Sequence, residues 1–225
     1  MIPIGKWFHP WRVQINRYRS FTFQGARYRY CMNSYNESWD NERTVEIPLF
    51  QKMAGEVKRQ GGAVLEIGNV LAYYGPIDWQ VVDKYETATH VTPCDIVDFS
   101  FQERYDFIFA ISTIEHIGFD EEMRKFPEQW DESKLLAAIA KIVNEGLKGG
   151  GRFVVSFPLG YNIKLDNLLF SGQLGEQHSF FLKRISLSNR WCEVGKEAVL
   201  GARYNTPFYL GNAVCIAEFR SHQSL

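Results

Sequence analysis

Two acidic residues, Glu66 and Asp83, each follow a short apolar run, residues 63–65 and residues 79–82. Both runs suit buried parallel strands, so each carboxylate should lie where its strand ends. Glu66 and Asp83 are 17 positions apart (83 minus 66). Carboxylates at one edge of a nucleotide-binding α/β sheet accept hydrogen bonds from ribose hydroxyls. The pattern therefore predicts a nucleoside site.

The most hydrophobic run of the chain, residues 105–112, predicts a central strand that is buried on both faces. It should bring Ser112, Glu115 and His116 to the same edge as the first two carboxylates. We expect Glu115 and His116 to be the catalytic pair, because a neutral His116 imidazole can take a proton from a substrate hydroxyl. A structural role for this pair is the open alternative.

Five segments resemble, in chain order, the successive motifs of class I S-adenosylmethionine-dependent methyltransferases: VLEIGN, VVDKYE, CDIVDF, YDFIFAISTIEHIG and LKGGGRFVVSFP. The resemblance covers roughly residues 45–220. It implies an α/β fold with a mostly parallel seven-stranded Rossmann-like sheet, helices on both faces and an antiparallel C-terminal strand. It also implies S-adenosylmethionine as the cofactor.

The resemblance further implies which residues hold the cofactor. Asp95 matches a position whose carboxylate faces the exocyclic amine of adenine, which donates hydrogen bonds. Asp98, three positions on, is expected in a turn or cap. The cofactor-binding residues expected at matching positions are Glu66, Gly68, Asn69, Asp83, Lys84, Asp95, Ile96 and Ser112.

The chain departs from the family in the loop after its first strand. The usual Gly-x-Gly-x-Gly pattern is here Gly68-Asn69-Val70-Leu71-Ala72, so only the first glycine is kept. The spacing between the two carboxylates is also below the roughly 20 residues usual in nucleotide-binding units. The helix after the first strand therefore has room for only a turn or two.

Two helices are expected, one before the first strand and one after the strand at residues 105–112. One has Pro48 in its first turn and stops at Gly61. The other carries an apolar stripe over residues 135–147 and ends at the glycines of residues 148–151. Further strands are expected at residues 152–157, within residues 179–194 and at residues 213–219.

Residues 1–44 are interpreted as an N-terminal basic and aromatic extension before a methyltransferase-like domain of residues 45–225. Residues 1–36 hold six basic and no acidic side chains, so they carry +6 while the remainder carries −7 (19 basic minus 26 acidic). Arginines among aromatics could cap the active site and grip an anionic substrate. Alternatively, the aromatics pack on the domain or on a second subunit of a homodimer.

Substrate contacts are expected from two other segments. Asn41, Glu42 and Arg43 precede the first helix and face the pocket in one interpretation, and form an ordinary helix entry in the other. Tyr161 and Asn162 leave the sheet at the edge where parallel-sheet enzymes keep their substrates, with a surface turn as the alternative. The substrate-binding candidates are Arg43, Tyr161 and Asn162.

Composition limits the partners. A net charge of −1 gives no overall attraction to nucleic acid. The four cysteines show neither metal-ligand nor disulfide-scaffold spacing, which favours a reduced cytoplasmic protein without a metal site. No apolar run is long enough to cross a membrane.

These features favour a cytoplasmic, metal-independent methyltransferase enzyme that transfers a methyl group to an oxygen or nitrogen of a sugar or other small molecule. The alternative is a non-catalytic binding or scaffold domain that retains the fold with an eroded glycine loop. A nicotinamide-dependent oxidoreductase is disfavoured, because its pyrophosphate loop needs the missing glycines.

Overall fold

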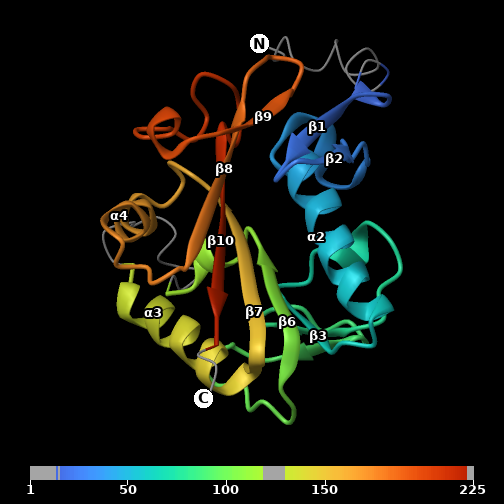
Figure 1. The fold of residues 1–225 in the computed structure, drawn as a ribbon, viewed down its shortest axis with the longest axis vertical. Helices are drawn as coiled ribbons and strands as arrows, with labels where there is room; N and C mark the ends of the chain where they lie inside the picture. The colour runs from blue at the N-terminus through green and yellow to red at the C-terminus, as the bar shows by residue number, and fades with distance from the viewer. Residues whose placement is uncertain (1–13, 15, 119–129, 222–225) are drawn as a thin grey trace.

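A computed structural model describes residues 14, 16–118 and 130–221 (Figure 1). The strands are β1 (Ser20–Phe23), β2 (Ala26–Arg29), β3 (Val64–Ile67), β4 (Gln80–Asp83), β5 (Val91–Pro93), β6 (Tyr105–Ile111), β7 (Leu147–Pro158), β8 (His178–Arg184), β9 (Trp191–Val194) and β10 (Ala213–Arg220). The α-helices are α2 (Arg43–Arg59), α3 (Glu132–Lys141) and α4 (Ile163–Ser171). Shorter helical turns are η2 (Tyr35–Asp40), η3 (Leu71–Tyr73), η4 (Ile114–His116), η7 (Ile142–Gly146) and η8 (Lys196–Ala198).

The main sheet has eight strands in the order β5-β4-β3-β6-β7-β10-β8-β9. The first five are parallel to one another, and β10 runs antiparallel between β7 and β8. The expected α/β class, with an antiparallel C-terminal strand inserted into a mostly parallel sheet, is confirmed.

Side chains on the central strands alternate between two hydrophobic cores, as the period of two along a strand requires. On β6, Ile108 and Ala110 join the core beneath α3 and α4, whereas Phe107, Phe109 and Ile111 join the core beneath α2. The helices accordingly cover opposite faces of the sheet (Figure 1). Burial on both faces explains why residues 105–111 are almost uniformly apolar.

The expectation of seven strands is wrong by one, because residues 179–194 form two strands rather than one. Asn189 adopts a left-handed conformation with φ of 57°, and Ile185 N–H donates to the Arg190 carbonyl at 2.8 Å. This turn folds β9 back onto β8 as an additional edge strand.

The expected start of the first helix at Pro48 is also wrong, since α2 begins five residues earlier at Arg43. A proline inside a helix leaves the carbonyl four residues before it without its usual donor. Here the Cys31 N–H donates to that Thr44 carbonyl at 2.9 Å, so the segment before the helix supplies the missing bond.

The helix over residues 135–147 ends before the expected glycine stop. α3 finishes at Lys141, a π-turn follows over Ile142–Gly146, and Leu147 already belongs to β7. Leu147 pairs with Tyr105, and the next pair is Arg152 with Phe107. The glycines of residues 149–151 therefore lie in a bulge of the strand, where their small size lets the extra residues loop out.

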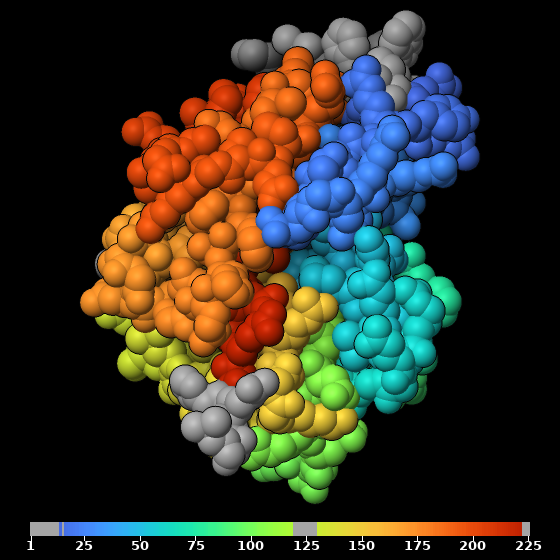
Figure 2. Space-filling view, in the orientation of Figure 1, coloured from blue at the N-terminus to red at the C-terminus, as the bar shows by residue number. Residues whose placement is uncertain are grey.

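The described part of the N-terminal extension packs on the domain. In Figure 2 the blue N-terminal hairpin lies against the orange C-terminal strands. Phe21 of β1 shares a hydrophobic core with Phe50 of α2 and Trp191 of β9. The Trp191 N–H donates to the Tyr30 hydroxyl at 2.9 Å. Lys6, Arg12 and the aromatics of residues 7–11 lie outside the described residues.

We expect Phe21→Ala to lower the free energy of unfolding by about 3–5 kcal/mol, the usual cost of truncating a buried phenylalanine. Phe21 is 4% exposed, and Tyr18, at 83% exposed, provides the control substitution Tyr18→Ala. Urea unfolding should show one cooperative transition that moves as a whole. A separate early transition, with the main one unchanged, would show instead that the hairpin is an independent appendage.

Candidate functional site

A pocket opens at the carboxyl ends of β3, β4 and β6 and has a volume of about 780 Å³, including the part open to solvent. This is the edge at which the sequence places its polar residues. The lining residues are Ile67, Gly68, Val82, Asp83, Lys84, Tyr85, Cys94, Asp95, Ile96, Ser112, Thr113, His116, Ile117, Gly118 and Lys134. The wall combines apolar side chains with polar and charged ones, and convergent polar groups in a pocket are typical of small-molecule sites.

Gly68, which begins the loop after β3, is required by its surroundings. Its φ is +84°, and a Cβ atom there would lie 2.4 Å from the Thr113 Oγ1. Gly68 N–H also donates to the Val82 carbonyl at 2.8 Å, which ties the end of β3 to β4. Only glycine allows both this conformation and this close approach to the segment after β6.

Glu66 lies behind the pocket wall and holds the loop. Its Oε1 accepts hydrogen bonds from the N–H groups of Val70 at 2.9 Å and Leu71 at 2.8 Å, and its Oε2 accepts one from the Trp79 indole at 3.0 Å. Burial raises the pKa of the Glu66 carboxyl, while the three donors act in the opposite direction. The short η3 turn that begins at Leu71 matches the predicted turn or two.

Asp83 is on the pocket wall, but local backbone groups use much of its hydrogen-bonding capacity. Oδ1 accepts from the N–H groups of Tyr85 at 2.8 Å and Glu86 at 3.0 Å, and Oδ2 accepts from Asn69 N–H at 3.0 Å. A carboxylate has about four acceptor positions, so one position on Oδ2 remains. The side chain of Asn69 bonds to Glu86 at 2.8 Å and to His90 at 3.2 Å, and it is not on the pocket wall.

Asp95 and Ile96 lie on the same wall, next to two lysines. Asp95 Oδ2 is 2.8 Å from the Lys134 ammonium and 3.4 Å from the Lys84 ammonium. Although partial burial opposes ionisation, the hydrogen bond from Lys134 keeps the pKa of Asp95 below its usual value. Sequence reasoning missed Lys134, because no local pattern shows that α3 returns to this point.

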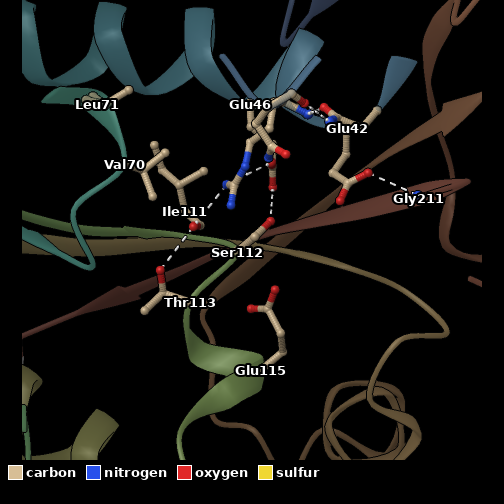
Figure 3. A network of polar contacts seen from close by, with 12 residues as sticks. Glu42, Glu46, Val70, Leu71, Ile111, Ser112, Thr113, Glu115 and Gly211 are labelled. Carbon is tan, nitrogen blue, oxygen red and sulfur yellow. Dashed lines mark hydrogen bonds and ion pairs between the residues drawn. The ribbon is translucent and has the colours of Figure 1, made fainter. Parts of the chain in front are cut away.

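On the opposite side, Ser112 connects the pocket to α2. Ser112 Oγ donates to Glu46 Oε1 at 2.8 Å, and the Arg43 guanidinium donates to Glu46 Oε2 at 3.2 Å and to the Ile111 carbonyl at 3.0 Å (Figure 3). Although burial opposes the charge, Glu46 and the neighbouring glutamates raise the pKa of Arg43. Arg43 thus stabilises the wall from behind. Sequence reasoning also missed Glu46, since it lies just before the expected start of the helix at Pro48.

The predicted catalytic pair is divided between wall and interior. His116 is on the wall, and its ring meets that of Tyr161 edge to face at 5.3 Å. Glu115 is buried and not on the wall, and its carbonyl accepts a hydrogen bond from the Asn162 amide at 3.1 Å. Asn162 also caps α4 by accepting from Leu165 N–H at 3.2 Å. Asn162 is therefore placed to hold the pair in position.

The structure thus brings about half of the candidate residues together on one wall. Those on the wall are Gly68, Asp83, Lys84, Asp95, Ile96, Ser112 and His116. Those not on it are Glu66, Asn69, Glu115, Arg43, Tyr161 and Asn162. Members of the second group still bond to the loops that form the wall, with Tyr161 against His116.

Comparisons with protein-family models and with curated proteins give no match. Among solved structures, the chain is similar to the N-methyltransferase NodS from Bradyrhizobium japonicum in complex with S-adenosyl-L-homocysteine, with 16% identity, 80% of this chain and 91% of that chain covered, and a TM-score of 0.44. The chain is also similar to the sugar N-methyltransferase KedS8 from Streptoalloteichus, with 13% identity, 79% of this chain and 88% of that chain covered, and a TM-score of 0.38. A third similar structure is an S-adenosylmethionine-dependent methyltransferase from Clostridium acetobutylicum, with 12% identity, 76% of this chain and 90% of that chain covered, and a TM-score of 0.39. With TM-scores below 0.5, these likenesses assign no residue roles and no substrate.

In the described ranges, none of the helices has the length and apolar character needed to cross a bilayer.

One further carboxylate, Asp166 in the first turn of α4, accepts a hydrogen bond from the loop that carries Tyr161. Its Oδ2 accepts from Gly160 N–H at 2.7 Å, while Oδ1 is buried and has no hydrogen-bond partner among the described residues. Gly160 has φ of +78°, and a Cβ there would lie 2.5 Å from the Ala202 carbonyl oxygen. Burial raises the pKa of Asp166 to about 6.

A raised pKa in the folded state means that the neutral form stabilises the fold. The contribution of Asp166 should be fully present below its unfolded value of about 3.9 and should be lost as the pH rises through about 6. The stability of the wild type relative to Asp166→Asn should therefore fall by about 2–3 kcal/mol between pH 4 and pH 7.5. Urea titrations across this range measure the difference. Asp98→Asn, at an exposed site, is the control, and parallel curves for wild type and Asp166→Asn would contradict the assignment.

Proposed function

We propose that the chain is an S-adenosylmethionine-dependent methyltransferase that acts on a small-molecule or sugar acceptor without a metal. The observation that carries this proposal is the pocket at the ends of β3, β4 and β6, with Gly68 against Thr113, Asp83 at the end of β4, and Asp95 and Ile96 beside them. The sequence motifs imply cofactor contacts at Gly68, Asp83, Asp95 and Ile96, which supports the proposal.

The residues on the wall fit the cofactor. Ile96 and Ile117 offer apolar surface for adenine, and Asp95 offers a carboxylate for its exocyclic amine. Asp83 keeps an acceptor position for a ribose hydroxyl. Because Gly68 has no side chain, the cofactor can approach its backbone closely. The loop lacks the glycines that a dinucleotide pyrophosphate needs, which disfavours a nicotinamide cofactor.

When bound, S-adenosylmethionine supplies an electrophilic methyl group on a sulfonium sulfur. The chain would then contribute mainly by positioning the acceptor. Ser112 and His116 stand on the wall opposite the two aspartates, so the acceptor atom would lie beside them. His116 can accept the proton that an acceptor hydroxyl or ammonium loses.

We further propose that the enzyme works in the cytoplasm. All four cysteines are free, which suits a reducing compartment. A homodimer through the N-terminal segment stays a prediction, and analytical ultracentrifugation would test it.

The cofactor assignment predicts that S-adenosylhomocysteine binds, measured by isothermal titration, and that nicotinamide dinucleotides give no heat. Asp83→Ala should weaken binding by about 1.5–3 kcal/mol, the range for a hydrogen bond to a charged group. Because Asp83 also holds three backbone N–H groups, the melting temperature of the free variant must be measured alongside.

Asp98→Ala is the matched control, since Asp98 is an exposed carboxylate that is absent from the pocket wall. It should bind S-adenosylhomocysteine as the wild type does. Binding of dinucleotides without the homocysteine nucleoside would overturn the cofactor assignment. Binding of neither would favour the scaffold alternative.

For His116, we expect His116→Ala to keep its affinity for S-adenosylhomocysteine within about threefold and to lower turnover by about 10²–10⁴-fold, the range for general-base catalysis. A methyl-transfer screen of glycosides and amino compounds would identify the acceptor for this assay. Normal turnover of the variant on an accepted substrate would exclude His116 as the base.

A further inference from the structure

Beside the pocket, on the α2 side of Ser112, three glutamates form a buried group that we call the glutamate cluster: Glu42, Glu46 and Glu115. Their exposed fractions are 8%, 0% and 1%. The Arg43 guanidinium forms an ion pair with Glu46, and its positive charge opposes the rise in the pKa of Glu42 and Glu115. One guanidinium cannot neutralise three carboxylates, so the cluster has an excess of negative charge or holds protons.

Two members of the cluster have defined partners. Glu46 is bonded by Arg43 and Ser112, as described above. Glu42 Oε2 accepts from Gly211 N–H at 3.0 Å. Burial, followed by the nearby Glu46, raises the pKa of Glu42.

Glu115 differs from the other two. Its Oε2 is buried and has no hydrogen-bond partner among the described residues. Figure 3 shows its side chain pointing from η4 toward Ser112, opposite Glu46 of α2 and Glu42 just before that helix. Burial raises the pKa of Glu115 well above its ordinary value, and Glu46 and Glu42 add to this effect. A buried acceptor left in this state suits a donor that arrives with a ligand.

Aromatic rings connect this carboxylate to the surface. His116 packs edge to face on Tyr161, and Tyr161 packs edge to face on Tyr204 at 5.1 Å. Burial raises the pKa of Tyr204, and the charges of Glu42 and Glu115 contribute. Tyr204 therefore lies near the cluster, while Tyr161 is 41% exposed. Carboxylates and the faces of aromatic rings both attract cations.

The charge and the acceptor groups of the glutamate cluster limit which ligands it can bind. A phosphate or carboxylate would meet like charge. Among the residues that the structure describes, no group of three or more His, Cys, Asp or Glu side chains is arranged to hold a metal ion. A hydroxyl could donate one hydrogen bond but has no positive charge to favour the ionised form of the carboxyls. An ammonium supplies both positive charge and up to three donors.

We propose that the glutamate cluster binds the amino group of the acceptor, so that the methylated atom is an amine nitrogen rather than an alcohol oxygen. This inference rests on the proposed function. His116 Nε2 lies 3.9 Å from Glu115 Oε1, so a base stands next to the bound ammonium.

The reaction balances with one proton released. The ammonium first gives a proton to His116, and from there the proton passes to water. The nitrogen lone pair then forms the new C–N bond while the S–C bond of S-adenosylmethionine breaks. The pair from the broken bond stays on sulfur, so the products are the methylated ammonium and S-adenosylhomocysteine.

Binding of matched amine and alcohol pairs tests the proposal. The pairs are glucosamine with glucose, tyramine with tyrosol, and butylamine with butanol. Each is titrated calorimetrically into the full chain at pH 7.5, with and without S-adenosylhomocysteine. At least one amine should bind about tenfold or more tightly than its alcohol, as expected for hydrogen bonds to charged groups.

Glu115→Gln should abolish this preference for the amine, while the exposed control Glu145→Gln keeps it. Glu42→Gln is the second variant should Glu115→Gln fold poorly. Glu115→Gln should also be more stable than the wild type above neutral pH, because it removes a buried unpaired carboxylate. If Glu115 had a purely structural role, Glu115→Gln would instead be less stable than the wild type.

An absent preference for amines in all three pairs overturns the proposal, as does an equal preference in wild type and Glu115→Gln. Failure of the proposed function gives a different result. In that case S-adenosylhomocysteine does not bind to any variant, including those with an intact cluster. Normal S-adenosylhomocysteine binding by Glu115→Gln, together with loss of amine binding, supports both.

Discussion

The close approach of Gly68 to Thr113 is the constraint on which the site depends. Parallel pairing of β3 with β6 brings the segments that leave these two strands together, and no Cβ fits between them. This contact fixes where the loop after β3 turns and where the segment with Ser112 and His116 begins. Glu66 then holds the loop by accepting from two backbone N–H groups and an indole.

The same edge of the sheet contains two electrostatic environments. On the β4 and β5 side, Asp95 is compensated by Lys84 and Lys134. On the α2 side, three glutamates share one arginine. An uncompensated buried carboxylate opposes folding, and proteins retain such groups mainly at functional sites. The difference between the two sides is consistent with a neutral nucleoside on one side and a cationic acceptor on the other.

Sequence patterns predicted most strands of the sheet and seven of the thirteen candidate residues that lie on the wall, because these depend on local order. The carboxylates at the ends of β3 and β4, and the serine after β6, follow directly from apolar runs that stop. The patterns did not predict Lys134 on the wall, since its position depends on how α3 packs. Nor did they reveal the early start of α2. A proline normally marks a helix start, and only the Cys31 bond to Thr44 makes its interior position acceptable.

The distribution of roles among the candidates also needed the structure. Glu66 and Asn69 read as cofactor contacts, but their side chains hold the loop that the cofactor would touch. Arg43 reads as a substrate contact that faces the pocket, but burial against Glu46 gives it a partner of its own. In each case the residue is close to the site, but its hydrogen-bond partners determine its role, and only the fold shows which partners these are.

A crystal structure of the chain with S-adenosylhomocysteine tests the central claim most directly. The account predicts the adenine between Ile96 and Ile117 with its amine toward Asp95, a ribose hydroxyl at Asp83, and the sulfur beside Ser112 and His116. A nucleoside bound elsewhere, or this pocket empty at saturating ligand, would contradict it.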